Sequence, residues 1–194
     1  MALILVATPA AANANSYETL VEANAYFESR LPLSPPWEDA ESPSAALVMA
    51  TRTLESSFMP GKRLVQAGDA SYYVTRRQWT GTPSTTTQRL SWPRTGMYDR
   101  NGNLIPSGEI PYELKDATSE LAGQLIGSDR TLDNDVIVQG ITSLKAGSVA
   151  LSFKDSIAPQ VLPDAAVNML PPSWFTDEII AAAYSAGSAE FEVI

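Results

Sequence analysis

The sequence contains neither cysteine nor histidine among its 194 residues. These two absences exclude disulfide bonds, thiolate catalysis, zinc sites of the cysteine–histidine kind and Ser-His catalytic triads. No G-x-G-x-x-G or Walker A sequence is present either. Three acidic clusters, at 38–41, 128–136 and 177–178, have the composition of solvated loops, and none has the EF-hand pattern. We therefore expect no enzymatic activity, no cofactor and no metal site.

Long hydrophobic runs are also missing. The N-terminal stretch MALILVATPAAANANSY has no basic residue at its start and only about seven apolar residues before Pro9, which is short for a secretory signal. No segment approaches the ~20 apolar residues that a membrane-spanning helix needs. We expect residues 2–7 to form a short strand or an extended arm, and we expect no membrane partner.

Positive charge is scarce. The chain has 13 Lys and Arg against 22 Asp and Glu, a net charge of −9, while 44% of its residues are hydrophobic. This composition is typical of one globular domain with a real core. Tight binding of nucleic acid by the whole surface is disfavoured, because neutralising phosphates requires clustered cations.

Three segments carry a helical pattern. Thr19 and Glu22 form a capping box before a helix expected at 20–31. Ser42 and Pro43 start a second helix that runs to about 58. A third opens at Pro111 and runs to about 126.

The other segments lack helical periodicity. Residues 61–109 form a long inserted loop with a strand-like stretch at 71–79, and 135–153 is expected to be a β-hairpin. The proline-punctuated segment 155–194 is interpreted as an extended C-terminal arm outside the core, with a weak helix at 176–184. The predicted fold is mainly α: a small bundle of three to four helices with an inserted long loop, a β-hairpin and an extended C-terminal arm.

Residues 72–100 allow two interpretations. They hold five arginines against one acid, interleaved with aromatic residues, a composition that suits single-stranded nucleic acid. The alternative is that the aromatic residues anchor the loop and the arginines pair with carboxylates, within the chain or between subunits. The acidic remainder of the chain favours the second interpretation.

Two stretches carry a family resemblance: ANANSYETLVEANAYFESR (12–30) and QRLSWPRTGMYDRNGNLIPSGEIPYELKDATSELAGQL (88–125). They resemble a tailed-phage family with an A-D-S-Y…A-E-A-x-A-Y-F start and a W-P-R-x-G…I-P…K-x-A-x-x-E-L-A centre. Its members are labelled DnaT-like single-stranded-DNA-binding proteins and also look like head-to-tail connector proteins. This chain departs from the pattern at Asn15, where the family has Asp, at an insertion over 64–87, and in a long tail beyond about 155.

The connector resemblance implies a structural virion protein, made in the host cytoplasm and placed in the neck between capsid portal and tail. It would form a head-to-tail adaptor ring, a dodecamer by analogy, that contacts the portal and a tail or nozzle protein. Genomic DNA would pass through the channel without sequence-specific contact. On this interpretation residues 1–154 are the adaptor domain, with a helical core at 16–60 and 110–128. The alternative function is a single-stranded-DNA-binding replication accessory protein; no residue set nominates a catalytic phage protein.

Each function predicts its own contact residues. The residues expected at a subunit or portal interface are Trp92, Pro93, Arg94, Gly96, Tyr98, Trp174 and Phe175. Those expected to contact nucleic acid under the alternative are Arg76, Arg77, Trp79 and Arg89.

The sequence also predicts roles within the WPRTG run at 92–96. Trp92 is expected to pack on the third helix, and Pro93 and Gly96 to shape a rigid turn. Arg94 is expected to remain free to reach a neighbour's carboxylate, so that Arg94→Ala would weaken ring assembly more than folding of the monomer.

Overall fold

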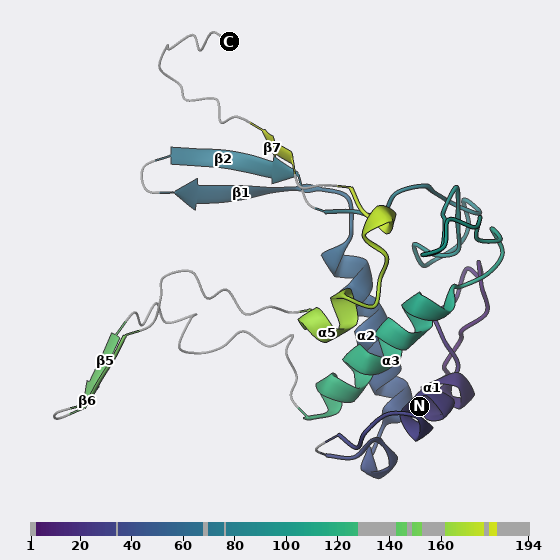
Figure 1. Cartoon of the computed structure of the whole chain (residues 1–194), viewed down its shortest axis with the longest axis horizontal. Coiled ribbons are helices and arrows are strands. Elements are labelled where there is room, and N and C mark those ends of the chain that lie inside the picture. The colour runs from purple at the N-terminus through teal and green to yellow at the C-terminus, as the bar shows by residue number, and fades with distance from the viewer. Residues whose placement is uncertain are drawn as a thin grey trace, which may run out of the picture.

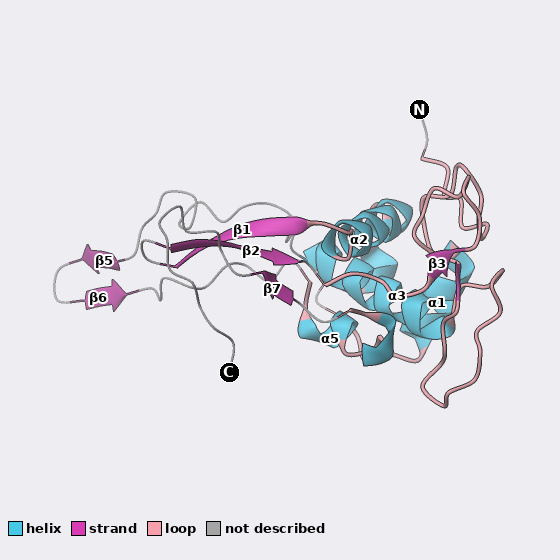
Figure 2. Ribbon diagram, turned by 90° about the horizontal axis from the view of Figure 1, so that it is seen from above, coloured by secondary structure: helices cyan, strands magenta, loops and turns pink. Residues whose placement is uncertain are grey.

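The computed structural model describes most of the chain, namely residues 3–33, 35–67, 70–75, 77–127, 143–146, 149–152, 162–176 and 179–181. In these residues a helical body carries two separate groups of strands that extend away from it (Figures 1 and 2). The mainly helical fold class is therefore confirmed.

The helical body is built from α1 (Leu20–Glu28), α2 (Pro43–Ser57) and α3 (Tyr112–Gly127). Two 3-10 turns, η1 (Trp37–Asp39) and η2 (Pro172–Trp174), and the short helix α5 (Asp164–Val167) complete it. Helices α2 and α3 pack along each other, α1 packs on α3, and α5 lies against α3 from the other side (Figure 1). The three helices expected from the sequence are confirmed.

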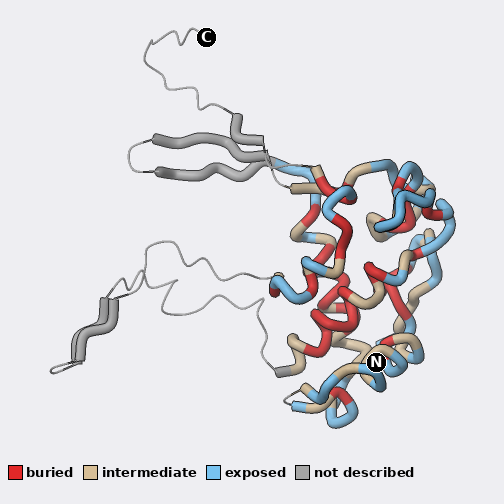
Figure 3. The backbone as a smooth tube through the Cα atoms, viewed as in Figure 1, coloured by how far each residue is buried: buried red, intermediate tan, exposed pale blue. Residues whose placement is uncertain are grey.

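Local signals explain where these helices begin. The Thr19 hydroxyl accepts a hydrogen bond from the Glu22 backbone N–H, and the Glu22 carboxylate accepts one from the Thr19 backbone N–H, so the capping box at α1 is formed. Pro43 occupies the first turn of α2, where its missing N–H costs nothing. The periodicity of apolar residues then decides which faces meet. The fully buried apolar residues of α2 and α3 are Leu47, Ala50, Leu54, Leu114, Ala117, Leu121 and Ala122, and they belong to the buried centre of the body (Figure 3).

The first group of strands forms an antiparallel sheet in the order β1 (Lys62–Ala67), β2 (Ala70–Thr75), β7 (Ile179–Ala181). The second is the hairpin β5 (Ser143–Ala146) and β6 (Val149–Ser152). A short pair, β3 (Thr82–Pro83) and β4 (Arg94–Thr95), closes the loop between β2 and α3. The β5–β6 pairing confirms the predicted hairpin over these residues; 135–142, 147–148 and 153 lie outside the described part.

Three expectations need correction. Residues 61–109 are not simply an inserted loop, since they contain β1, β2 and the β3–β4 pair. The weak helix expected at 176–184 is wrong, because Ile179–Ala181 form strand β7 beside β2. Residues 162–176 are not an arm outside the core: Ala166, Leu170 and Trp174 are buried in the main hydrophobic cluster. In each case a partner distant in the sequence supplies the pairing or the apolar contact that the local pattern does not show.

Gly123 sets the distance between α1 and α3. A Cβ atom at this position would lie 2.4 Å from Leu33 Cδ1 and 2.8 Å from Phe27 Cζ, too close for a side chain to fit without movement. The absence of a side chain at Gly123 therefore allows Phe27 to approach α3.

We expect Gly123→Val to lower the free energy of unfolding by about 1–3 kcal/mol, because overpacking of the α1–α3 contact outweighs the modest gain in helix propensity over glycine. Urea denaturation checks this. The matched control is Gly108→Val, where nothing lies within 4 Å of an added Cβ. Equal stability of the two variants would contradict the close packing at Gly123.

Candidate functional site: the WPRTG loop, the aromatic cluster and the buried carboxylates

Five aromatic rings meet where α2 ends. Trp79 and Phe175 stack with ring centroids 4.8 Å apart, and Phe58 lies 4.7 and 4.4 Å from them. Trp92 contacts Trp79 edge-on at 5.7 Å and Trp174 at 4.7 Å. All five side chains are buried. The cluster joins α2, the loop after β2, the WPRTG run and the C-terminal segment into one core.

Backbone hydrogen bonds fix the two outer segments of this cluster to each other. Thr80 N donates to Trp174 O at 2.8 Å, and Thr176 N donates to Gln78 O at 2.9 Å. The isolated bridge between Trp79 and Phe175 has the same register as the β2–β7 pairing, in which Thr75 faces Ile179. The buried aromatic pair and the β2–β7 pairing therefore share one antiparallel register, and the core sets the register of the projecting sheet.

Arg94 is a structural residue of the loop. Its guanidinium donates to three backbone carbonyls, Thr80 O at 2.7 Å, Gly81 O at 2.9 Å and Ser91 O at 3.0 Å, and only 8% of the residue is exposed. Burial lowers the pKa of the guanidinium, and the negative charge of Glu55 opposes that shift. The expectation that Arg94 remains free for a neighbouring subunit is therefore wrong, because its donors already satisfy buried carbonyls of its own loop.

Glu55 of α2 holds the loop from the other side. Its carboxylate accepts hydrogen bonds from the Ser91 N–H and hydroxyl, both at 2.8 Å, and from the Tyr17 hydroxyl. Burial raises the pKa of Glu55, whereas the Ser91 bonds act in the opposite direction. One helix carboxylate thus joins the N-terminal segment to the WPRTG loop.

The remaining predicted interface residues have different surroundings. Gly96 has φ +78°, a backbone conformation that favours glycine, as the turn requires. Trp92 is 1% exposed, and its peptide bond to Pro93 is cis. Trp174 and Phe175 lie in the core rather than on a surface, and the Trp174 indole donates to Tyr98 O at 2.7 Å. Tyr98, at 52%, and Gly96 are the exposed members of the predicted set.

The residues predicted to contact nucleic acid do not form one surface. Trp79 is buried and offers no face for base stacking. The Arg77 guanidinium lies 4.1 Å from the centre of the Phe175 ring, a cation–π contact within the chain. Arg89 is exposed, and its backbone N–H donates to Ala11 O. Arg76 lies outside the described residues.

A second group of side chains, three buried carboxylates, was not found by sequence reasoning. Glu18, Glu113 and Glu120 are carboxylates at most 3% exposed, located between α1 and α3 or beside them. A signal for two of them was available: Glu113 and Glu120 each directly precede a leucine of the α3 apolar stripe, seven residues apart. Glu18 has no such signal, since it precedes its helix.

Glu120 is the anchor of α1 on α3. Arg30 donates to both of its oxygens, at 2.6 and 2.7 Å, and the Tyr26 hydroxyl donates at 2.9 Å. The Arg30 hydrogen bonds lower the pKa of Glu120 to about 2. The pair is bidentate, the geometry in which arginine–carboxylate bonds are strongest.

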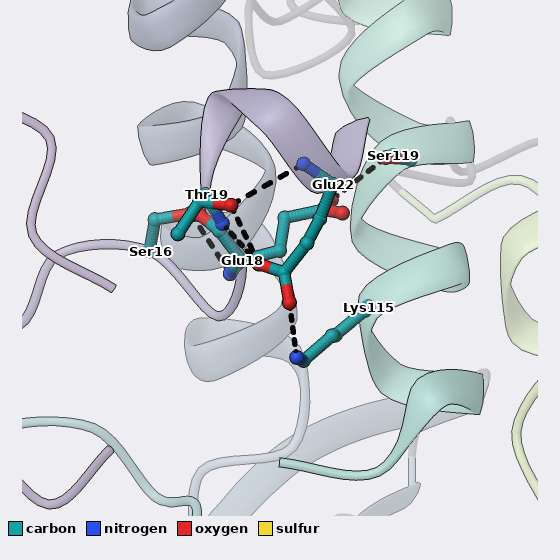
Figure 4. Close-up of polar contacts among 6 residues, drawn as sticks. All are labelled: Ser16, Glu18, Thr19, Glu22, Lys115 and Ser119. Carbon is teal, nitrogen blue, oxygen red and sulfur yellow. Dashed lines mark hydrogen bonds and ion pairs between the residues drawn. The ribbon is translucent and has the colours of Figure 1, made fainter. Parts of the chain in front are cut away.

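Glu18 has the opposite environment (Figure 4). Its carboxylate accepts a bond from the Ser119 hydroxyl at 2.8 Å and is 2% exposed, while Lys115 pairs with Glu22 at 2.5 Å instead. Burial, with a smaller contribution from the nearby charges of Glu22 and Asp116, raises the pKa of Glu18 to about 8. At neutral pH the Glu18 carboxyl is therefore mainly protonated in the folded protein.

The match to known proteins covers most of the chain. A family model described as "Putative DnaT-like ssDNA binding protein" matches residues 1–72 and 66–174. The chain belongs to this family. No curated protein and no solved structure matches it. The match spans the helices, the WPRTG loop and four of the five rings of the aromatic cluster, so this helical body is that of a DnaT-like family member.

Two further features bear on what this family member could bind. Over the described ranges, no helix combines the length and apolar character that crossing a bilayer demands. Among the described residues there is likewise no group of three acidic side chains arranged to hold a metal ion. The acidic clusters at 128–136 and 177–178 fall outside the described residues.

We expect Arg94→Met to lower the free energy of unfolding by about 2–4 kcal/mol, because buried carbonyls lose their donors. The matched control is Arg89→Met, an exposed site where we expect a change within about 0.5 kcal/mol. Urea denaturation measures both. An Arg94→Met protein as stable as the control would contradict the structural role.

We expect the Glu18 carboxyl to make stability depend on pH. Its folded pKa lies above its unfolded value of 4.5, so its contribution is fully present below about pH 4.5 and is lost as pH rises towards about 8. Glu18→Gln should remove this dependence of the free energy of unfolding on pH, whose slope is up to about 1.4 kcal/mol per pH unit. The variant should therefore become more stable relative to wild type as pH rises.

Urea unfolding at pH 5, 6.5, 8 and 9 measures the slope. The control is Glu28→Gln, an exposed position on the same α1 helix, which should unfold with the wild-type profile. Parallel profiles for Glu18→Gln and wild type would show that Glu18 is ionised in the folded protein.

Proposed function

We propose that this chain is a structural subunit of a tailed-phage virion, a head-to-tail adaptor that assembles into a ring beneath the portal. The observation that carries the proposal is the pair of strand groups, β1–β2–β7 and β5–β6, that extend from the helical body (Figures 1 and 2). No described helix packs along either group. The β5–β6 group has only two strands, and an isolated two-stranded hairpin is marginally stable in water. The β1–β2–β7 group has three strands but no described helix packed along it, so we expect a neighbouring chain to complete both projections.

The contacts that the lysine and arginine side chains make within the chain support an assembly role. Arg30 and Lys115 pair with carboxylates of the chain itself, and Arg94 donates its hydrogen bonds to backbone carbonyls of its own loop. The chain retains a net charge of −9. A ring of acidic subunits would let DNA pass through its channel without holding it, because like charges repel.

Purified protein should form closed rings, and virions should contain it in stoichiometric amount at the neck. Electron microscopy of both samples, with antibody labelling of the virions, checks this. Absence of the chain from virions would overturn the adaptor function, even if rings form in isolation.

A second candidate function is the binding of single-stranded DNA, which the description of the family names. One structural observation favours it: two tyrosines that do not belong to the predicted nucleic-acid set are exposed. Tyr98 is 52% and Tyr112 64% exposed, and Arg100 lies near Tyr112. Against it, Arg100 is engaged by Glu113, with Nε 3.9 Å from Oε1, and its Nη2 donates to Met169 O.

Titration with a single-stranded oligonucleotide at two salt concentrations separates the two functions. Under DNA binding, Tyr98→Ala and Tyr112→Ala should each weaken affinity by about 1–3 kcal/mol, the usual contribution of one stacked base. Under the adaptor function, we expect no salt-dependent binding at physiological ionic strength. The control is Tyr26→Phe, because Tyr26 is held by Glu120 and is not available for stacking.

A further inference from the structure

The N-terminal segment 3–7 has one paired edge. The Asn15 side chain makes the hydrogen bonds that a neighbouring strand would make. Its amide oxygen accepts a hydrogen bond from Val6 N at 2.7 Å, and its amide nitrogen donates one to Ile4 O at 2.8 Å. Val6 O also accepts from the backbone N–H groups of Asn15 and Ser16, at 2.9 and 3.2 Å. All of these bonds use even-numbered residues of the segment.

The other edge of the same segment is open. In an extended chain, the N–H and C=O of one residue point to one side and those of the next residue to the opposite side. The backbone groups of the odd residues, Leu3, Leu5 and Ala7, make no hydrogen bond to the described residues. Leu3 and Ile4 are also 50% and 75% exposed. The segment is therefore an unpaired strand edge with aliphatic side chains, which is prone to pair with another strand.

A second open edge lies elsewhere in the molecule. In the sheet order β1–β2–β7, strand β1 (Lys62–Ala67) is outermost and pairs with β2 alone among the assigned strands. With six residues, β1 is long enough to accept the five residues 3–7. The described N-terminal residues and the sheet are well separated in both ribbon views (Figures 1 and 2), so the two edges do not meet within one chain.

We propose that residues 3–7 of one copy add as a strand to the outer edge of β1 in a second copy. Strand addition supplies main-chain hydrogen bonds to both unpaired edges at once. Because the two surfaces differ and lie apart on the chain, the contact is head-to-tail, which generates rings when the rotation closes. This inference rests on the proposed ring and names the segments that join its subunits.

Cross-linking tests the pairing, and the chain offers a cysteine-free background. Chains with Ile4→Cys are mixed with chains carrying Leu64→Cys or Val65→Cys, which together cover both faces of β1, and are mildly oxidised. The matched control replaces Ile4→Cys by Val21→Cys, because Val21 is 77% exposed and also β-branched but lies on α1. We expect disulfide-linked heterodimers with Ile4→Cys in at least about tenfold excess over the control.

Two results would overturn the inference. One is equal cross-linking of Ile4→Cys and Val21→Cys at concentrations where the wild-type chain is oligomeric. The other is a predominance of Ile4–Ile4 dimers, which would mean a two-fold contact between N-terminal segments.

A backbone variant gives an independent measurement. Leu3→Pro removes an N–H from the open edge, whereas Leu3→Ala removes the same side chain and keeps the N–H. We expect Leu3→Pro to weaken self-association by at least about tenfold relative to Leu3→Ala in analytical ultracentrifugation, with unchanged thermal unfolding.

The two proposals fail in different ways. If the wild-type chain forms rings and Leu3→Pro forms them equally well, the strand exchange is wrong and the ring remains. If the wild-type chain is monomeric at every concentration, both are wrong.

Discussion

The burial of the aromatic cluster is the constraint on which the rest of the structure depends. Burying a large aromatic side chain is worth about 1.5–3 kcal/mol, and this cluster buries five of them. The cluster brings together segments as far apart in the sequence as Phe58, at the end of α2, and Phe175, which are 117 positions apart. Without it, neither the loop after β2 nor the segment before β7 would have an apolar surface to pack on.

The same cluster decides in which direction the β1–β2–β7 sheet extends from the helical body. Trp79 follows β2 closely and Phe175 precedes β7, and their pairing continues the register of the two strands. The core therefore orients the sheet from its base. This arrangement suits the proposed assembly role, since a projecting edge serves as a contact only if the body holds it in a fixed direction.

The chain uses its few cations to satisfy its own buried acceptors. Arg94 satisfies loop carbonyls and Arg30 satisfies Glu120, whereas Glu18 is kept uncharged by burial. Burying charge in this way is costly unless each group is paired or neutralised. These cations are engaged within the described part of the chain, and the whole sequence carries a net charge of −9. The charge of the chain and the description of its family therefore point in different directions.

The sequence by itself determined the helices. Capping at Thr19, Pro43 at the start of α2 and the stripe of leucines on α3 are local signals, and local hydrogen bonds and periodicity are sufficient to place a helix. It also determined the β5–β6 pairing and the glycine turn at Gly96.

Only the tertiary structure decided which side chains are available to a partner. Arg94, Trp79 and Trp174 read as surface contacts in the sequence, yet they are buried by segments that lie far away along the chain. The local sequence likewise did not predict strand β7 or the open edges of residues 3–7 and β1. The physical reason is that burial and strand pairing depend on long-range contacts, whereas capping and helical periodicity are set by neighbours within a few residues.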